Sequence, residues 1–302
     1  MKVVILVSTY NGERFLRNQI DSLLSQVGDF DIDIVFRDDG SQDRTKDILE
    51  EYSKNNSNIK WFSGTNLKPA KSFMDLLWKC GDYDFYCFCD QDDVWDDNKI
   101  EEGINQIKHL NTPGFYYSNA RLVNSELLPY GVNVYKNIPC NDIFTVMCAS
   151  NVIGCTMIMN NQLVSFLRNN KAPSVVSMHD SYIARVCLAI GGTIIYNHRP
   201  YMSYRQHENN VIGIKKTLVD KVKYALMKTA SRPSITVDIQ AQEILNLYSS
   251  DISEENKKWL NRVANYRKNI LSRISLALSR KPTYSSFGMG MQMRIAILLG
   301  NR

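Results

Sequence analysis

The feature of this sequence that most constrains its fold is the repeated alternation of short apolar runs with segments whose apolar residues recur at helical spacing. A run such as Val3–Val7 has the length of a buried strand, whereas Leu16, Ile20 and Leu23 are spaced as on one face of a helix. Strands that alternate with helices predict an α/β fold, a mostly parallel sheet with helices on both faces. The predicted strands in this half are Val3–Val7, Ile32–Phe36, Ile59–Phe62 and Phe85–Cys89, and the predicted helices contain residues 16–27, 43–52 and 71–80.

The pattern continues less regularly towards Gly213. Phe115–Ser118, Ile153–Met159 and Thr193–Tyr196 predict further strands, and Ser181–Ile190 predicts a helix closed by two glycines. Beyond Gly213 the remaining chain is expected to be mainly helical.

The charge of the chain also changes at Gly213. Residues 1–213 carry 20 Lys and Arg against 25 Asp and Glu, whereas residues 214–302 carry 16 against 6, so the net charges are −5 and +10. We therefore predict an α/β domain over residues 1–213 and a basic helical region over residues 214–302. The basic helices are expected to lie against anionic lipid headgroups, or alternatively to serve in packing or dimerisation with solvated lysines. No motif supports nucleic-acid binding.

The cysteines and the N-terminus bear on location. Seven cysteines, an odd number without CxxC spacing, are typical of reduced core thiols in a cytosolic protein. The run Val3–Val7 is too short for a signal peptide, and no stretch approaches the roughly 20 apolar residues that span a bilayer. We expect a soluble or peripheral protein.

Polar residues follow three of the predicted strands directly. Thr9 and Tyr10 follow the first, Asp38 and Asp39 the second, and Asp90-Gln91-Asp92-Asp93 the fourth. Ligands of α/β sheets bind at the carboxyl ends of strands, so these residues predict a site at one edge of the sheet.

The string Asp90-Gln91-Asp92-Asp93 is the strongest chemical signal, because it places three carboxylates in four residues. Crowded like charges are costly unless a cation neutralises them, and oxygen ligands suit Mg²⁺ or Mn²⁺. The alternative is a solvated acidic turn before the next helix.

Asp38-Asp39-Gly40-Ser41 carries less information alone, since these are ordinary turn residues. At the edge of such a sheet, however, a carboxylate can accept hydrogen bonds from a pyrimidine base or a ribose, and Tyr10 can stack on the base.

Taken together, these motifs resemble the family-2 glycosyltransferases of the GT-A fold over residues 1 to about 213. The resemblance to this family rests on the order and spacing of four groups of residues. A narrower resemblance, to bacterial rhamnosyltransferases of surface-polysaccharide assembly, rests on the continuation of the acidic string to Trp95 and on two later motifs. The groups are Thr9-Tyr10-Asn11-Gly12-Glu13, Asp38-Asp39-Gly40-Ser41, Asn66 with Lys71, and Asp90-Gln91-Asp92-Asp93, and the later motifs are His179-Asp180 and Tyr204-Arg205-Gln206-His207-Glu208-Asn209-Asn210-Val211-Ile212-Gly213.

The resemblance implies a role for each matching residue. Asp92 and Asp90 are expected to bind the metal, Asp180 to act as catalytic base, and His207 to be a further metal or diphosphate ligand. The expected donor-nucleotide contacts are Thr9, Tyr10, Glu13, Asp38, Asp39, Asn66, Lys71, Asp90 and Arg205, and the expected acceptor or sugar pocket contains Trp95, Gly154, Cys155 and His179.

Several of these residues have ordinary structural alternatives. Asp180 can be the N-cap of the helix that follows it, and His207 a solvated loop histidine. Lys71 and Arg205 can pair with surface carboxylates instead of phosphate. Trp95 can fill the core, and Gly154-Cys155-Thr156 can form a β-bulge.

The resemblance implies an inverting glycosyltransferase that moves a sugar, L-rhamnose from dTDP-rhamnose, to a hydroxyl of a lipid-linked surface glycan at the inner face of the cell membrane. The alternatives are a UDP-hexose transferase of the same family and a catalytically silent scaffold of a polysaccharide assembly complex. A nucleotidyltransferase would need a Gly- and Lys-rich loop near residues 8–14, and a nicotinamide oxidoreductase would need GxGxxG after the first strand; the chain has neither.

Overall fold

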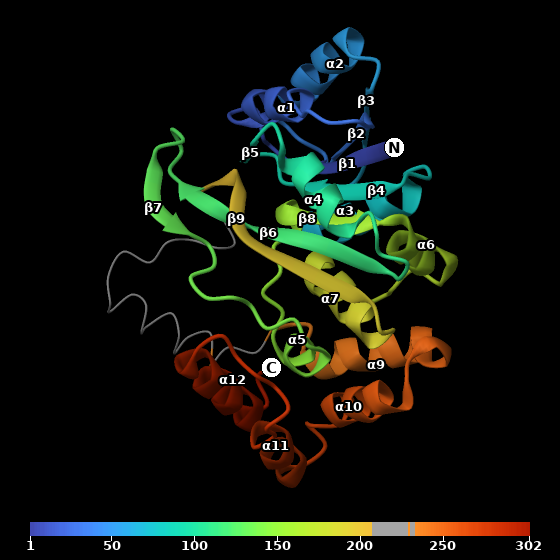
Figure 1. Ribbon diagram of the computed structural model, residues 1–302, viewed down its shortest axis with the longest axis vertical. Coiled ribbons are helices and arrows are strands. Elements are labelled where there is room, and N and C mark those ends of the chain that lie inside the picture. The colour runs from blue at the N-terminus through green and yellow to red at the C-terminus, as the bar shows by residue number, and fades with distance from the viewer. Residues whose placement is uncertain (207–228, 230–232) are drawn as a thin grey trace.

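A computed structural model describes residues 1–206, 229 and 233–302. Nine strands of the described chain form one sheet with the order β3-β2-β1-β4-β8-β6-β9-β5, and β7 pairs with β6 beside it. Figure 1 shows this sheet curling through the molecule. The strands are β1 (Lys2–Thr9), β2 (Asp31–Asp38), β3 (Ile59–Ser63), β4 (Phe85–Cys89), β5 (Val94–Trp95), β6 (Gly114–Val123), β7 (Pro129–Asn133), β8 (Met157–Asn160) and β9 (Thr193–Arg205).

The predicted mostly parallel sheet is confirmed by the strand directions. β1 is parallel to β2 and β4, β2 is parallel to β3, and β6 is parallel to β9. β8 runs antiparallel to both β4 and β6, so those two strands share a direction, and β5 and β7 run against their neighbours. The chain leaves β1 towards β2 and β3 and later returns on its other side as β4, so the sheet has a switch point between β1 and β4.

Helices cover both faces of the sheet. Alternate residues of β1 enter two separate apolar clusters: Val4 and Leu6 pack with α3, α6 and α7, whereas Val3, Ile5 and Val7 pack with α1, α2 and α4. The helices are α1 (Leu16–Leu24), α2 (Thr45–Asn55), α3 (Lys68–Lys79), α4 (Lys99–Ile107), α5 (Ile143–Cys148), η1 (Gly154–Thr156), α6 (Asn161–Asn169), α7 (His179–Ala189), α9 (Val237–Tyr248), η2 (Ser249–Asp251), α10 (Glu254–Ala264), α11 (Ile270–Ala277) and α12 (Phe287–Leu299).

Several predicted elements have different bounds. The strands predicted at Phe115–Ser118 and Thr193–Tyr196 extend to Val123 and Arg205. The first helix was expected to reach Val27, but α1 ends at Leu24 and the Val27 side chain is 52% exposed, because the Val27 N–H donates to the Asp97 carbonyl instead of continuing the helix. The strand expected from Ile153 begins at Met157. The hydroxyl of Thr156 donates to the Ile153 carbonyl at 2.8 Å and helps to close a 3₁₀ turn there.

The C-terminal helices α9 and α10 pack on the α/β domain. Ile244, Trp259 and Leu260 belong to the same apolar cluster as residues of α5 and α7, and the hydroxyls of Tyr182 and Tyr248 are 3.1 Å apart. The predicted boundary at Gly213 lies outside the described residues, so the division into residues 1–213 and 214–302 stays a prediction.

Two further expectations concern the cysteines and the membrane. All seven cysteines are free thiols, as predicted, and all but Cys140 are buried. Among the helices of residues 1–206 and 233–302, none combines the length and apolarity that a bilayer crossing requires.

Candidate active site

The loop after β1 and the loop after β4 are held together by one side chain. The Tyr10 N–H donates to Oε1 of Gln91 at 2.8 Å, and Nε2 of Gln91 donates back to the Tyr10 carbonyl at 3.1 Å. A Cβ at Gly12 would lie 2.3 Å from the same Oε1, so only glycine allows this approach. Gln91 therefore fixes the half-exposed Tyr10 ring next to the acidic string.

The loop after β1 is also tied to the loop after β2. Asn11 adopts φ 48°, the left-handed conformation that its Asn-Gly sequence predicts, and its N–H donates to the Ser41 hydroxyl at 2.9 Å. The Glu13 carboxylate, expected at the nucleotide, accepts from the Arg44 N–H at 2.9 Å. Thr9 is buried, and its carbonyl accepts from the Asp39 N–H at 2.8 Å.

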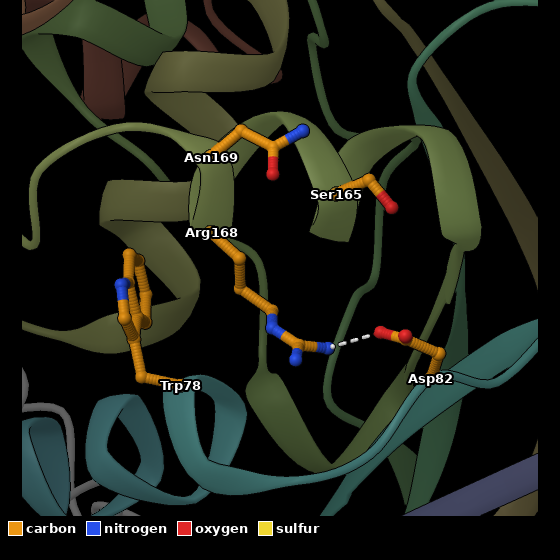
Figure 2. A pocket seen from close by; sticks show the side chains of 5 residues that line it. All are labelled: Trp78, Asp82, Ser165, Arg168 and Asn169. Atoms are coloured by element: carbon orange, nitrogen blue, oxygen red, sulfur yellow. Dashed lines mark hydrogen bonds and ion pairs between the residues drawn. The ribbon is translucent and has the colours of Figure 1, made fainter.

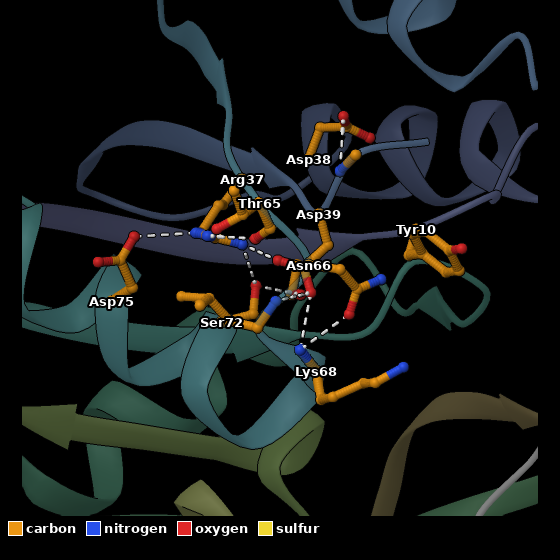
Figure 3. A network of polar contacts seen from close by, with 12 residues as sticks. Tyr10, Arg37, Asp38, Asp39, Thr65, Asn66, Lys68, Ser72 and Asp75 are labelled. Atoms are coloured by element: carbon orange, nitrogen blue, oxygen red, sulfur yellow. Dashed lines mark hydrogen bonds and ion pairs between the residues drawn. The ribbon is translucent and has the colours of Figure 1, made fainter. Parts of the chain in front are cut away.

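Asp38 and Asp39 organise their own loop. Asp38 is fully buried and accepts from the N–H groups of Gly40 and Ser41 and from the Ser63 hydroxyl. Asp39 forms an ion pair with the buried Arg37 and accepts the N–H groups of Leu67 and Lys68, both at 3.0 Å, as Figure 3 shows in part. A nucleotide that contacts these carboxylates must share them with the loop.

Asn66 and Lys71 lie at the start of α3, beside this network. Both side chains are exposed, and the side-chain oxygen Oδ1 of Asn66 accepts from the Lys68 N–H at 3.1 Å. Lys71 lies in the first turn of α3, where it is accessible to solvent. The structure thus places both residues on the surface, and Asn66 is linked to Asp39 through the Lys68 N–H.

The loop after β4 forms the chemical centre of the site. The carboxylates of Asp90 and Asp93 and the thiol of Cys155 place one ligand atom each within 4.8 Å of one another. Burial, with the negative charges of Asp92 and Asp180, raises the pKa of Asp90 to about 7. Burial, with the negative charges of Asp92 and Asp90, also raises the pKa of Asp93.

These residues fit a divalent cation. Asp93 is completely buried, and its Oδ2 atom has no hydrogen-bond partner among the described residues. A buried, unpaired carboxylate oxygen beside a second carboxylate is costly without a cation. Two hard oxygen donors suit Mg²⁺ or Mn²⁺, and the thiol of Cys155 adds a softer donor.

The group of possible metal ligands in the structure differs from the group predicted from the sequence. Asp90 is common to both, but the second carboxylate is that of Asp93, and Asp92 adds its charge nearby. Asp93 was part of the predicted acidic string but had no assigned role, and Cys155 was expected in the acceptor pocket. His207 lies outside the described residues.

Asp180 is joined to this group through the 3₁₀ turn η1. The Gly154 N–H donates to Oδ2 of Asp180 at 3.1 Å, while the next residue, Cys155, contacts the acidic group. Helix α7 begins at His179 and its N-cap is Met178, so the alternative role of Asp180 as an N-cap is wrong. The carboxylate is 8% exposed and lies in the first turn of α7.

His179 is a packed residue under the turn. Its ring lies 4.2 Å from the ring of Phe73 and 4.8 Å from that of Phe88, and burial lowers its pKa. A Cβ at Gly154 would lie 2.3 Å from Nε2 of His179, so glycine is required for this contact. His179 is 3% exposed and supports the turn from below.

Strand β9 brings Arg205 to the acidic loop. Because β9 pairs with β5, the Arg205 N–H donates to Oδ1 of Asp93 at 3.1 Å and its Nε to the Asp92 carbonyl at 2.7 Å. The guanidinium also stacks on Phe15 at 4.5 Å. Arg205 is 3% exposed, so its visible role is to hold the loop.

Trp95 and Lys99 lie beneath the site. Trp95, which was expected to line the sugar pocket or fill the core, is 2% exposed and belongs to a core cluster. Nζ of the equally buried Lys99 lies 3.4 Å from the Trp95 ring centroid. Burial lowers the pKa of Lys99, while the nearby thiols and Asp93 act in the opposite direction.

Lys99 is a candidate residue that sequence reasoning missed. It shares one helical stripe of α4 with Gly103 and Ile107, and all three are buried. A lysine on an apolar stripe was the available signal. Its ammonium is an internal positive charge close to the carboxylate of Asp93.

Two surface cavities of the described residues bear on where a ligand can bind. The larger of the two, of about 370 Å³, lies between α3 and α6 (Figure 2) and is lined by Trp78, Asp82, Ser165, Arg168 and Asn169. Asp82 precedes β4, so this cavity lies at the amino end of that strand, away from the site. The second, of about 300 Å³, borders the acidic loop through Arg205 and Phe15.

The sequence of the chain matches known proteins. Residues 4–130 match the model of glycosyl transferase family 2. The chain is 28% identical over 236 residues to the dTDP-rhamnosyl transferase RfbG of Shigella flexneri, covering 72% of this chain and 77% of the relative. It is 30% identical over 123 residues to the UDP-Glc:alpha-D-GlcNAc-diphosphoundecaprenol beta-1,3-glucosyltransferase WfgD of Escherichia coli, covering 41% and 47%.

Solved structures agree on the fold. TarS of S. aureus in complex with UDP-GlcNAc aligns with a TM-score of 0.58 at 18% identity, covering 93% of this chain and 77% of that chain. GalNAc-T7 with UDP, GalNAc and Mn²⁺ aligns with a TM-score of 0.56 at 14% identity, covering 87% and 54%. The fold and these matches define a glycosyltransferase of the GT-A fold. Residues 4–130 are its family-2 glycosyltransferase domain.

Proposed function

We propose that this glycosyltransferase transfers a sugar from a nucleoside-diphosphate donor to an acceptor hydroxyl with inversion. One observation carries the proposal: two consecutive residues of η1 contact the two groups. The Gly154 N–H donates to Asp180, and Cys155 lies beside the carboxylates of Asp90 and Asp93. A carboxylate for proton transfer and a cation site for a diphosphate are the two chemical requirements of single displacement. Both lie at the carboxyl edge of the sheet.

In the proposed reaction Asp180 accepts the proton of the acceptor hydroxyl. The hydroxyl oxygen forms a bond to the anomeric carbon as the bond from that carbon to the diphosphate oxygen breaks, on the opposite face. Asp90 and Asp92, with Asp93, Cys155 and His207 as further donors, would hold a divalent cation, and such a cation would supply Lewis-acid stabilisation of the diphosphate. Arg205 holds the acidic loop in place through Asp92 and Asp93.

The remaining proposed contacts are to the donor and the sugar. Thr9, Tyr10, Glu13, Asp38 and Asp39 surround the edge where three loops meet, and a base stacked on the exposed Tyr10 ring would reach this edge. Asn66 is joined to Asp39 through the Lys68 N–H, and Lys71 lies one helical turn further along α3, so both are proposed to complete this contact. Gly154, Cys155 and His179 are proposed for the acceptor side.

The donor we propose is dTDP-L-rhamnose. The similarity to the dTDP-rhamnosyl transferase RfbG, whose alignment is the longer of the two, supports this choice. The second relative supports a UDP-hexose as the alternative. The proposed acceptor is a lipid-linked surface glycan, and the proposed location is the inner face of the cell membrane, peripherally bound. Homodimerisation remains a second possibility for the C-terminal helices.

Thermal unfolding with a panel of donors tests this proposal. With Mn²⁺ or Mg²⁺ present, dTDP-rhamnose is expected to raise the unfolding midpoint by several degrees, since a ligand at about 100 times its Kd stabilises by about 2.7 kcal/mol. UDP-hexoses are expected to raise the unfolding midpoint by a smaller amount. A panel without any metal-dependent shift would favour the silent-scaffold alternative.

Metal affinity is expected to fall as the pH is lowered below about 7. Asp90 has a pKa raised to about 7, so below that pH a cation must displace a proton, at about a tenfold loss of affinity per pH unit. Without metal, the stability of the fold has the opposite pH dependence. Between pH 3.8, the ordinary pKa of an aspartate, and about pH 7, folded Asp90 keeps a proton that the unfolded chain has lost. The contribution of Asp90 to the free energy of unfolding therefore declines as the pH rises through this range.

Calorimetric titration of Mn²⁺ at several pH values, in buffers of different ionisation enthalpy, measures this proton release. Asp90→Asn is the matched control and is expected to bind weakly with little pH dependence. An affinity that stays constant between about pH 6 and pH 8 in the unmodified protein would contradict the assignment of Asp90.

A further inference from the structure

The last two helices expose large apolar side chains to solvent. In α11, Ile270, Ile274 and Leu278 recur every four residues and are 58%, 38% and 69% exposed, and Leu271 beside them is 73% exposed. Isolated exposed apolar residues are common on protein surfaces, but a stripe at helical spacing is not.

Helix α12 shows the same arrangement. Phe287 is 86% exposed, and Met291, Ile295, Leu298 and Leu299 follow it along one side of the helix with exposures between 36% and 53%. The opposite side, with Met293, Ala296 and Ile297, is buried. α11 and α12 pack against each other at the end of the molecule away from α1 and α2 (Figure 1).

Positive charge predominates around these stripes. Residues 256–302 contain ten Lys and Arg residues and no Asp or Glu, and Glu255 forms an ion pair with Lys281. Lys268 and Arg280, which flank α11, are exposed, and Arg294 donates from α12 to the Ala277 carbonyl at the end of α11. Exposed apolar stripes bordered mainly by positive charge complement a surface that is apolar beneath and anionic above.

We propose that the exposed apolar faces of α11 and α12 are a docking surface for an anionic lipid bilayer. The inference deepens the proposed membrane location and rests on that part of the proposed function. A second copy of the chain fits less well, because an isologous interface would bring two predominantly positive surfaces together. Nucleic acid fits less well, since the stripes are mainly aliphatic and offer Phe287 alone for stacking.

Sedimentation of the full chain with vesicles tests the proposal. The unmodified protein is expected to bind vesicles that contain phosphatidylglycerol and to bind pure phosphatidylcholine at least tenfold more weakly, with high salt reducing the difference. The double variant Leu271→Ser, Phe287→Ser is expected to lose at least tenfold in affinity. The matched control Leu128→Ser, Ile138→Ser removes side chains that are 63% and 74% exposed elsewhere, and is expected to bind normally.

A second variant separates the charge from the apolar stripes. Lys268→Glu, Arg280→Glu is expected to weaken binding to anionic vesicles while leaving the donor-dependent unfolding shift unchanged. That shift tests the proposed reaction independently, so failure of one proposal is distinguishable from failure of the other.

Three results would overturn the bilayer assignment. The first is absence of binding to anionic vesicles, and the second is binding that Leu271→Ser, Phe287→Ser does not alter. The third is a concentration-dependent dimer in analytical ultracentrifugation that the same variant dissociates, without vesicle binding, which would identify a second copy as the occupant.

Discussion

Replacing Asp180 with Asn is expected to lower the turnover number by about 10²- to 10⁴-fold, the usual contribution of a positioned base. An amide cannot accept the proton of the acceptor hydroxyl. Its side-chain oxygen can still accept from the Gly154 N–H, which Asp180 now binds at 3.1 Å, so η1 is expected to remain folded. Donor binding, measured by the unfolding shift, is therefore expected to stay close to that of the unmodified protein.

Asp142→Asn is the matched control for this variant. Asp142 also accepts a backbone N–H, that of Thr145 at 2.9 Å, but does so as the N-cap of α5. This variant is expected to retain transfer. Near-normal turnover in Asp180→Asn, or an equal loss in Asp142→Asn, would remove the base assignment and point to a structural effect.

The second large effect is expected at the acidic loop. Asp90→Asn and Asp92→Ala are both expected to abolish transfer and the metal-dependent part of donor binding. The loss of metal affinity is expected to exceed the roughly 10- to 100-fold typical of outer-shell partners. Asp90 contributes a ligand atom to the group with Asp93 and Cys155, and Asp92 contributes charge beside it.

Manganese titration of the variants distinguishes the two readings of this loop. If Asp92 binds the cation directly, Asp92→Ala is expected to weaken metal binding as much as Asp90→Asn does. If Asp90, Asp93 and Cys155 form the site, Asp93→Asn is expected to weaken metal binding more than Asp92→Ala does. Asp97→Asn, in the turn between β5 and α4, is the control and is expected to bind normally. Unchanged metal affinity in all three of the other variants would exclude a cation at this loop.

The sequence was sufficient for the α/β architecture because its signals are local. The apolar runs of β1 and β4 and the stripe of α1 are each contained within a few residues. The rule that parallel strands end at one edge then predicts that Thr9, Asp38 and Asp90 lie together.

The contacts that complete the site are nonlocal and could not be read in this way. Cys155 meets Asp90 and Asp93 only because β8 is inserted between β4 and β6 and carries η1 at its start. Cys155 was expected in the acceptor pocket instead of beside the carboxylates, and Lys99 lies in a polar stretch, Asp96 to Glu102, where a lysine is usually interpreted as solvent-exposed.

The turn η1 has a consequence for how such an enzyme can change. One peptide bond separates the residue that anchors Asp180 from the residue that contacts the acidic group. The two reactive centres are therefore mechanically linked: a backbone shift at Gly154 that suits a bulkier acceptor also displaces the diphosphate side. New acceptor preferences should arise from surrounding loops, such as the segment between β6 and β7, while Gly154 and Cys155 are kept.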